Sequence, residues 1–79
     1  MEKKDMIIAK LNAFAIVNDY YFCWDNNPEN GKEEEYLSIN VRVKNGMLTP
    51  KHLAILHKLN PSLIRLYDDG TMSVEIKMN

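Results

Sequence analysis

The chain has 79 residues, of which 46% are hydrophobic and 27% charged, and its formal net charge is −1. This composition excludes a mainly disordered chain, and a single cysteine excludes a miniprotein held together by internal disulfides. No apolar run approaches the roughly 20 residues of a membrane-spanning helix, so we expect one globular domain over residues 1–79, in the cytoplasm and without a membrane or a secretory signal.

The first half of the chain is predicted to form one helix and two strands. Residues 4–18 carry apolar side chains at spacings of three and four, which is typical of a largely buried helix. The aromatic run 20–25 favours a strand, and the turn-forming residues 26–31 that follow mark the clearest loop in the chain. Residues 36–43 alternate strictly between apolar and polar side chains, which predicts a second strand with one buried face.

The second half is predicted to form another helix and two more strands. Thr49 is a candidate N-cap, and Pro50 suits the first helical position because its missing N–H has no partner there. This helix, over 49–59, should end at Asn60. Strands over 63–67 and 71–78 then follow.

The register of the last two strands follows from their hydrophobic pattern. A three-residue loop over 68–70 brings Leu66 opposite Met72 and Ile64 opposite Val74. A two-residue turn would instead oppose apolar to polar side chains. The pattern therefore favours the three-residue loop.

Two helices and four antiparallel strands in the order αββαββ fit an α+β two-layer sandwich with both helices on one sheet face. A right-handed crossover through the second helix gives the strand order 63–67, 71–78, 36–43, 20–25. The central strands are then those with the cleanest alternation, and the edges are the short or aromatic ones. This arrangement is a circularly permuted ferredoxin-like sandwich.

No catalytic or metal-binding constellation stands out in the sequence. Cys23 with His52 or His57 suggests a nucleophile and base, but no known catalytic spacing surrounds them, and a buried structural cysteine is the simpler interpretation. The two histidines are five residues apart on a helix, so their rings diverge and cannot share a metal. The acidic run 33–35 lacks the alternating oxygen ligands of a calcium loop and indicates a solvated loop edge. We therefore expect no enzyme, no metal and no cofactor.

The sheet face that the helices leave open is the feature with functional content. It combines aromatic and cationic side chains of the kinds that dominate protein interfaces. The candidate binding residues are Phe22, Trp24, Tyr36, Asn40, Arg42, Arg65, Tyr67 and Lys77. Alternation does not decide which side of strand 20–25 faces outward. Analogy with the final hairpin favours Phe22 and Trp24 over the alternate set of Tyr21 and Cys23.

Two functions fit this surface. The first is a small non-enzymatic interaction module that binds a protein partner, or a second copy of itself as a homodimer, through the sheet face or its edge. The second is a single-stranded nucleic-acid binder that stacks bases on the rings, which the net charge of −1 and the presence of Glu75 on the same face disfavour. A third interpretation places Phe22 and Trp24 in the core, with the acidic loop folded over them.

Overall fold

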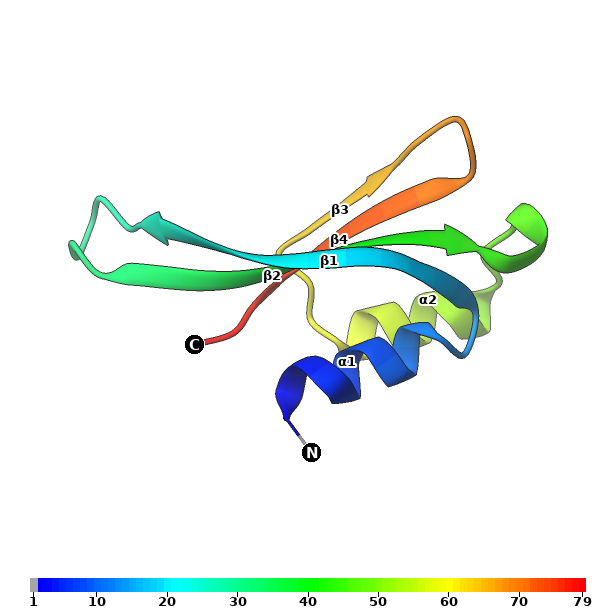
Figure 1. Ribbon diagram of the computed structural model, residues 1–79, viewed down its shortest axis with the longest axis horizontal. Helices are drawn as coiled ribbons and strands as arrows, with labels where there is room; N and C mark the ends of the chain where they lie inside the picture. The colour runs from blue at the N-terminus through cyan, green and yellow to red at the C-terminus, as the bar shows by residue number, and fades with distance from the viewer. Residues whose placement is uncertain (1) are drawn as a thin grey trace.

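The computed structural model describes residues 2–79 as two layers, a sheet with two helices beneath one of its faces (Figure 1). The elements are α1 (Lys3–Leu11), β1 (Ala15–Asn26), β2 (Glu33–Val43), the short 3-10 helix η1 (Lys44–Gly46), α2 (Pro50–Lys58), β3 (Leu63–Leu66) and β4 (Thr71–Lys77). All strand pairs are antiparallel, and the order across the sheet is β1-β2-β4-β3. The predicted α+β class with two helices and a four-stranded antiparallel sheet is confirmed.

The first helix is shorter than its apolar stripe predicts, and the first strand is longer. α1 ends at Leu11, and β1 begins at Ala15 rather than at residue 20. The predicted helix over 4–18 is therefore wrong beyond residue 11. Ile16 and Val17 are β-branched and favour a strand, and pairing with β2 decides between two patterns that the apolar positions fit equally well.

The hairpin of β1 and β2 is also longer than predicted. The glutamates over 33–35, expected at a solvated loop edge, belong to β2 and pair with residues 24–26 of β1. The connecting loop spans only 27–32. As a result, the hairpin reaches well past the helices (Figure 1).

The second helix begins as predicted, with Thr49 as its N-cap and Pro50 in its first turn. The Thr49 hydroxyl oxygen accepts a hydrogen bond of 3.3 Å from the His52 backbone N–H, and His52 Nδ1 accepts one of 3.2 Å from the Thr49 N–H. The imidazole of His52 also stacks on Phe14, with ring centroids 4.9 Å apart. His52 thus joins the start of α2 to the segment between α1 and β1.

The final hairpin has the predicted register. Leu66 pairs with Met72 and Ile64 pairs with Val74. The Tyr67 N–H donates to the Thr71 carbonyl across the three-residue loop, and Gly70 takes the left-handed conformation (φ 85°) that this loop requires.

The core lies between the helices and one face of the sheet, which we call the helix face. Ile7, Leu11 and Leu56 of the helices pack there with Phe14. The sheet contributes the buried side chains Leu37, Ile39, Val41, Met72, Val74 and Ile76. The opposite side of the sheet, which carries the alternate residues, is called the outer face below.

Candidate functional site

A bulge in β1 decides which of its aromatic side chains lies on which face. Val17 lies on the helix face, packed against the core. The register with β2 shifts between Val17 and Asp19, which leaves Asn18 as an extra residue. Beyond the shift, Tyr20 pairs with the buried Ile39. Because directly opposed residues of an antiparallel pair share a face, the even-numbered residues of β1 lie on the helix face from there on.

Phe22 and Trp24 therefore lie on the helix face, and the expectation that they share the outer face is wrong. Phe22 opposes the buried Leu37, while Tyr21 and Cys23 are the residues of this run on the outer face. The physical reason is the bulge, because one extra residue inverts the alternation of everything that follows it. Since both sets contain aromatic side chains, the hydrophobic pattern does not reveal this inversion.

The rings on the helix face form an exposed row that we call the aromatic row, made of Tyr20, Phe22 and Trp24. Their exposed fractions are 43%, 36% and 55%. They stay exposed because the hairpin extends beyond the two helices (Figure 1). Lys4 of α1 lies 5.1 Å from the centre of the Tyr20 ring, and the Trp24 indole N–H donates to Glu35 at 3.1 Å. The interpretation that places Phe22 and Trp24 in the core is therefore wrong, and the loop is not folded over them.

The backbone N–H and C=O groups of the same three residues point away from β2, towards the open edge of the sheet. The Met78 N–H donates to the Glu35 carbonyl (2.8 Å), so the backbone of Glu35 is turned towards β4. Trp24 opposes Glu35, so the two residues form a non-hydrogen-bonded pair of the antiparallel ladder. In such a pair, the N–H and C=O groups of each residue point away from the other strand. The same holds for Tyr20 and Phe22, two and four residues away. Within residues 2–79, no other segment makes a backbone hydrogen bond to any of the three.

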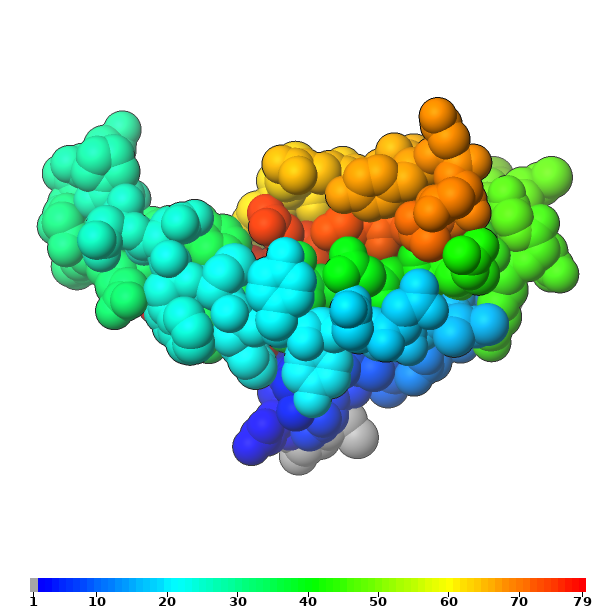
Figure 2. Space-filling model, turned by 45° about the horizontal axis from the view of Figure 1, so that its top comes forward, coloured from blue at the N-terminus to red at the C-terminus, as the bar shows by residue number. Residues whose placement is uncertain are grey.

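β1 is a long and weakly protected edge strand. It has 12 residues, none of which is lysine, arginine or proline, whereas β3 at the opposite edge is only 4 residues long. Natural sheets usually shield such an edge with charge, proline or a covering segment. In β1, the bulge and the carboxylates of Asp19 and Asp25 provide this protection. In Figure 2, β1 (cyan) runs along the front rim of the molecule, with α1 (blue) below it.

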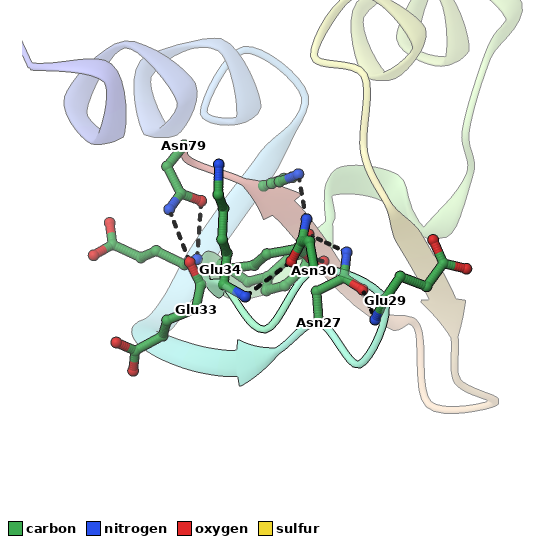
Figure 3. Close-up of polar contacts among 10 residues, drawn as sticks. Asn27, Glu29, Asn30, Glu33, Glu34 and Asn79 are labelled. Atoms are coloured by element: carbon green, nitrogen blue, oxygen red, sulfur yellow. Dashed lines mark hydrogen bonds and ion pairs between the residues drawn. The ribbon is translucent and has the colours of Figure 1, made fainter.

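Polar contacts brace the far end of the hairpin (Figure 3). In the loop, the side-chain oxygens of Asn27 and Asn30 accept backbone N–H groups two residues further on, at 2.9 Å each. The amide of Asn79 accepts from the Glu35 N–H at 3.0 Å and donates to the Glu33 carbonyl at 3.4 Å, which continues the ladder beyond β4. This bracing holds the arm that carries the aromatic row.

The outer face holds five of the eight predicted binding residues. By their pairing these are Tyr36, Asn40, Arg42, Arg65 and Lys77. The polar groups of four of them, all but Arg65, have partners within the chain. Tyr36 donates to Glu34 at 2.7 Å, Asn40 donates to Asp19 at 2.7 Å, and Arg42 donates to the Asp69 carbonyl at 3.0 Å. Carboxylates and cations thus lie together on this face.

Glu34 is the centre of the outer-face contacts. It accepts hydrogen bonds from Tyr36 and from the Asn27 amide (3.0 Å), and Lys77 Nζ lies 3.4 Å away. The Tyr36 hydroxyl, followed by the Asn27 amide and Lys77, holds the pKa of Glu34 below its ordinary value. The same hydrogen bond to Glu34 raises the pKa of Tyr36.

Tyr67, the remaining candidate, lies apart from the others at the end of the last hairpin. It lines a shallow hollow of about 370 Å3 together with Val43, Met47, Leu48 and Leu66. Because Phe22 and Trp24 are on the other face and Tyr67 is at this end, the structure does not bring the predicted set together as one surface. The sequence named the edge of the sheet as an alternative interface, but it did not identify the unpaired backbone of β1 as that edge. A long strand without lysine or proline was the signal for it.

The structure separates Cys23 from the two histidines, the candidate residues for nucleophilic chemistry. Cys23 is on the outer face, whereas His52 and His57 belong to α2 beneath the opposite face. Burial raises the pKa of the Cys23 thiol, with further contributions from Glu75 and Asp25. A raised pKa disfavours the thiolate that a nucleophile needs.

Comparison of the chain with models of known protein families, with curated proteins and with solved structures finds no match. Within residues 2–79, no three or more His, Cys, Asp or Glu side chains are grouped so that they could hold a metal ion. No helix in this part of the chain has both the length and the apolar character needed to cross a membrane.

Proposed function

We propose that the protein is a small non-enzymatic interaction module that binds a protein partner by adding a strand to the edge of β1. One observation carries this proposal: Tyr20, Phe22 and Trp24 combine unpaired outward backbone groups with exposed rings. In strand addition, main-chain hydrogen bonds supply affinity and alternate side chains supply specificity. Both elements therefore lie on the same three residues.

The edge is better supported than the outer face as the binding surface. The outer-face groups of Tyr36, Asn40 and Arg42 are already hydrogen-bonded within the chain, so a partner would have to replace those bonds. At the edge, a partner strand would instead satisfy groups that have no protein partner within residues 2–79. It would also cover apolar surface, which favours association.

Single-stranded nucleic-acid binding is the alternative, and it has less support. Base stacking on a sheet needs rings on the open face, and there the Tyr36 hydroxyl is engaged by Glu34. Carboxylates lie among the cations of that face, as the pairing of Glu75 with Ser38 and the contact of Asp19 with Asn40 illustrate. Such a surface lacks the positive footprint on which phosphate binding depends.

A labelled strand peptide tests the proposal. The probe is a fluorescein-labelled peptide of alternating threonine and valine with a lysine at each end, followed by fluorescence anisotropy. Phe22→Lys places a charge in the aromatic row, and we expect it to weaken binding about tenfold or more, because edge lysines oppose strand pairing. Ile64→Lys is the matched control, since Ile64 lies on the same face of the other edge strand and is 39% exposed against 36% for Phe22.

The proposal fails if the wild-type protein does not bind the peptide, or if both lysine variants weaken binding equally. Both variants should first show the circular dichroism spectrum of the wild type. Oligothymidine at low salt is the probe for the alternative. Saturable quenching of protein fluorescence by oligothymidine, without any binding of the strand peptide, would favour the nucleic-acid function.

Two finer assignments are part of this proposal. We assign the sandwich to the circularly permuted ferredoxin-like arrangement, which the strand order β1-β2-β4-β3 with both helices on one face supports. We also place the protein in the cytoplasm, because the free thiol of Cys23 fits a reducing compartment.

A further inference from the structure

We infer that the strand added to β1 is β1 of a second copy of this chain, paired antiparallel about a two-fold axis at Cys23. This inference rests on the proposed function, because it names the occupant of the same edge. The two four-stranded sheets then continue into one another across the axis. The length of the regular edge and the direction of its backbone groups allow this register, and charge selects it.

The length of the regular edge limits its centre to two residues. β1 is interrupted by the bulge at Asn18 and ends at Asn26. The uninterrupted stretch runs from Asp19 to Asn26, and its midpoint lies between Phe22 and Cys23. Antiparallel self-pairing centred on either residue uses all but one residue of this stretch.

The backbone phase, meaning which residues of β1 turn their N–H and C=O groups outward, allows this register. Hydrogen-bonded pairs between the two copies must join residues whose backbone groups point outward, and these are Tyr20, Phe22, Trp24 and, by the same alternation, Asn26. Centring on Cys23 pairs Phe22 with Trp24 and Tyr20 with Asn26. It also leaves Cys23 facing its own copy in a non-hydrogen-bonded pair.

Charge excludes the neighbouring register centred on Phe22. That register also satisfies the backbone phase, but it places Asp19 opposite Asp25 at both ends of the pairing. Like charges directly opposed across strands are destabilising. With the axis at Cys23, the Asp25 carboxylate instead opposes the Tyr21 ring and hydroxyl, and Asp19 opposes the neutral Asn27. A further shift in the same direction, to Tyr21, would oppose Trp24 to the bulge at Asn18. A shift the other way, to Trp24, would oppose Tyr20 to Pro28, where the hairpin turns.

The pairing also explains the exposed aromatic row. A two-fold axis perpendicular to the sheet keeps the helix faces of both copies on one side. The two rows then meet there, where Phe22 and Trp24 oppose one another, in the gap that the helices of a single copy leave uncovered. Cross-strand aromatic pairs of this kind add stability to a sheet.

Sedimentation velocity tests whether the second copy is the occupant. We expect a dimer at about 100 μM, because a contact of one strand edge is small and its affinity modest. Phe22→Lys should sediment as a monomer, and Ile64→Lys as a dimer like the wild type. A wild-type monomer at that concentration overturns the inference. If that monomer still binds the threonine–valine peptide, the proposed function stands without self-association.

Disulfide trapping with diamide tests the register. In a non-hydrogen-bonded pair the Cα atoms are about 4.5 Å apart, within reach of a disulfide. The two Cys23 thiols then join, and diamide takes up the two electrons and two protons that they release. Near-complete conversion to covalent dimer is expected for the wild type. Conversion should be lost in Phe22→Lys, which retains the cysteine.

Displaced cysteines provide the matched control, in a Cys23→Ser background. Tyr21→Cys and Asp25→Cys should each form little covalent dimer alone, because like positions are then about 13 Å apart along the strands. Mixed together, they should form the disulfide, since residue 21 opposes residue 25 of the second copy. A sedimenting dimer in which Cys23 does not cross-link, or in which either displaced cysteine cross-links alone, overturns this register while leaving the edge as the binding surface.

Discussion

The side-chain amide of Asn40 donates a 2.7 Å hydrogen bond to the carboxylate of Asp19, at the first residue pair beyond the bulge in β1. This contact lies on the outer face, at the point where the ladder with β2 resumes. The register set at this pair decides on which face of the sheet each side chain from Tyr20 to Asn26 lies. The position of the aromatic row is therefore a consequence of one extra residue, Asn18.

Deletion of Asn18 should destabilise the protein by more than about 2 kcal/mol, because either Val17 must leave the core or the aromatic row must change face. Urea denaturation measures the free energy of unfolding. Asn18→Ala keeps the extra residue, and its effect should stay within about 1 kcal/mol. Equal stability of the deletion variant and the wild type would show that the bulge does not set the register.

Truncation of α2 should distinguish its buried leucine from its exposed one. Leu56 is 2% exposed and packs in the core, whereas Leu53, three residues earlier, is 52% exposed. Leu56→Ala should cost about 2–5 kcal/mol, the range for a leucine cavity in a packed core, and Leu53→Ala less than about 1 kcal/mol. Thermal or urea unfolding of the two variants gives the comparison. Similar losses in both would contradict the packing of this helix.

Thr49→Ala should lower the free energy of unfolding by about 1 kcal/mol, because it removes the acceptor for the His52 N–H at the start of α2. Ser62→Ala serves as a control at an exposed position outside the helices, where we expect little change. Urea midpoints provide the measurement. A cap without energetic value would leave the two variants indistinguishable.

The pH dependence of stability should report on Glu34. The Tyr36 hydroxyl, the Asn27 amide and Lys77 hold its folded pKa below the ordinary value of 4.5. A lowered folded pKa stabilises the protein above the unfolded pKa, and this contribution disappears as the pH falls through the folded pKa. Glu34→Gln should therefore be less stable than the wild type near neutral pH, with the difference shrinking below about pH 4.5.

Urea midpoints across the acid range measure this effect. Glu29→Gln, at an exposed position in the neighbouring loop, is the matched control and should follow the wild-type curve. A constant offset between Glu34→Gln and the wild type at every pH would mean that the ionised carboxylate contributes nothing.

Much of the fold could be predicted because its central strands have one buried and one polar face. The alternation over 36–43 and in β4 identified the strands, and matching their apolar sides gave the register of the last hairpin. Local chemistry identified the start of α2, since Thr49 and Pro50 both have specific roles at a helix N-terminus. Where local preference and burial agreed, the pattern was sufficient.

The end of α1 and the face of the aromatic row could not be predicted for related reasons. The apolar residues over 13–17 fit a helix stripe and a strand equally well, and only pairing with β2 selects the strand. A bulge adds one residue without changing composition, so the alternation that it inverts is visible only in the ladder. The functional interpretation followed the wrong face for Phe22 and Trp24, because their side chains are apolar in either arrangement.

Residue-resolved hydrogen exchange by NMR tests most directly whether the edge of β1 binds a strand. In dilute protein, at about 10 μM, the outward amides of Tyr20, Phe22 and Trp24 should exchange rapidly, while those of Tyr21 and Cys23, turned towards β2, are protected. Saturation with the threonine–valine peptide should slow exchange about tenfold or more at the three outward amides and leave the other two unchanged. Exchange at Tyr20, Phe22 and Trp24 that is unaffected by the peptide, or slowed equally throughout the sheet, would contradict the account.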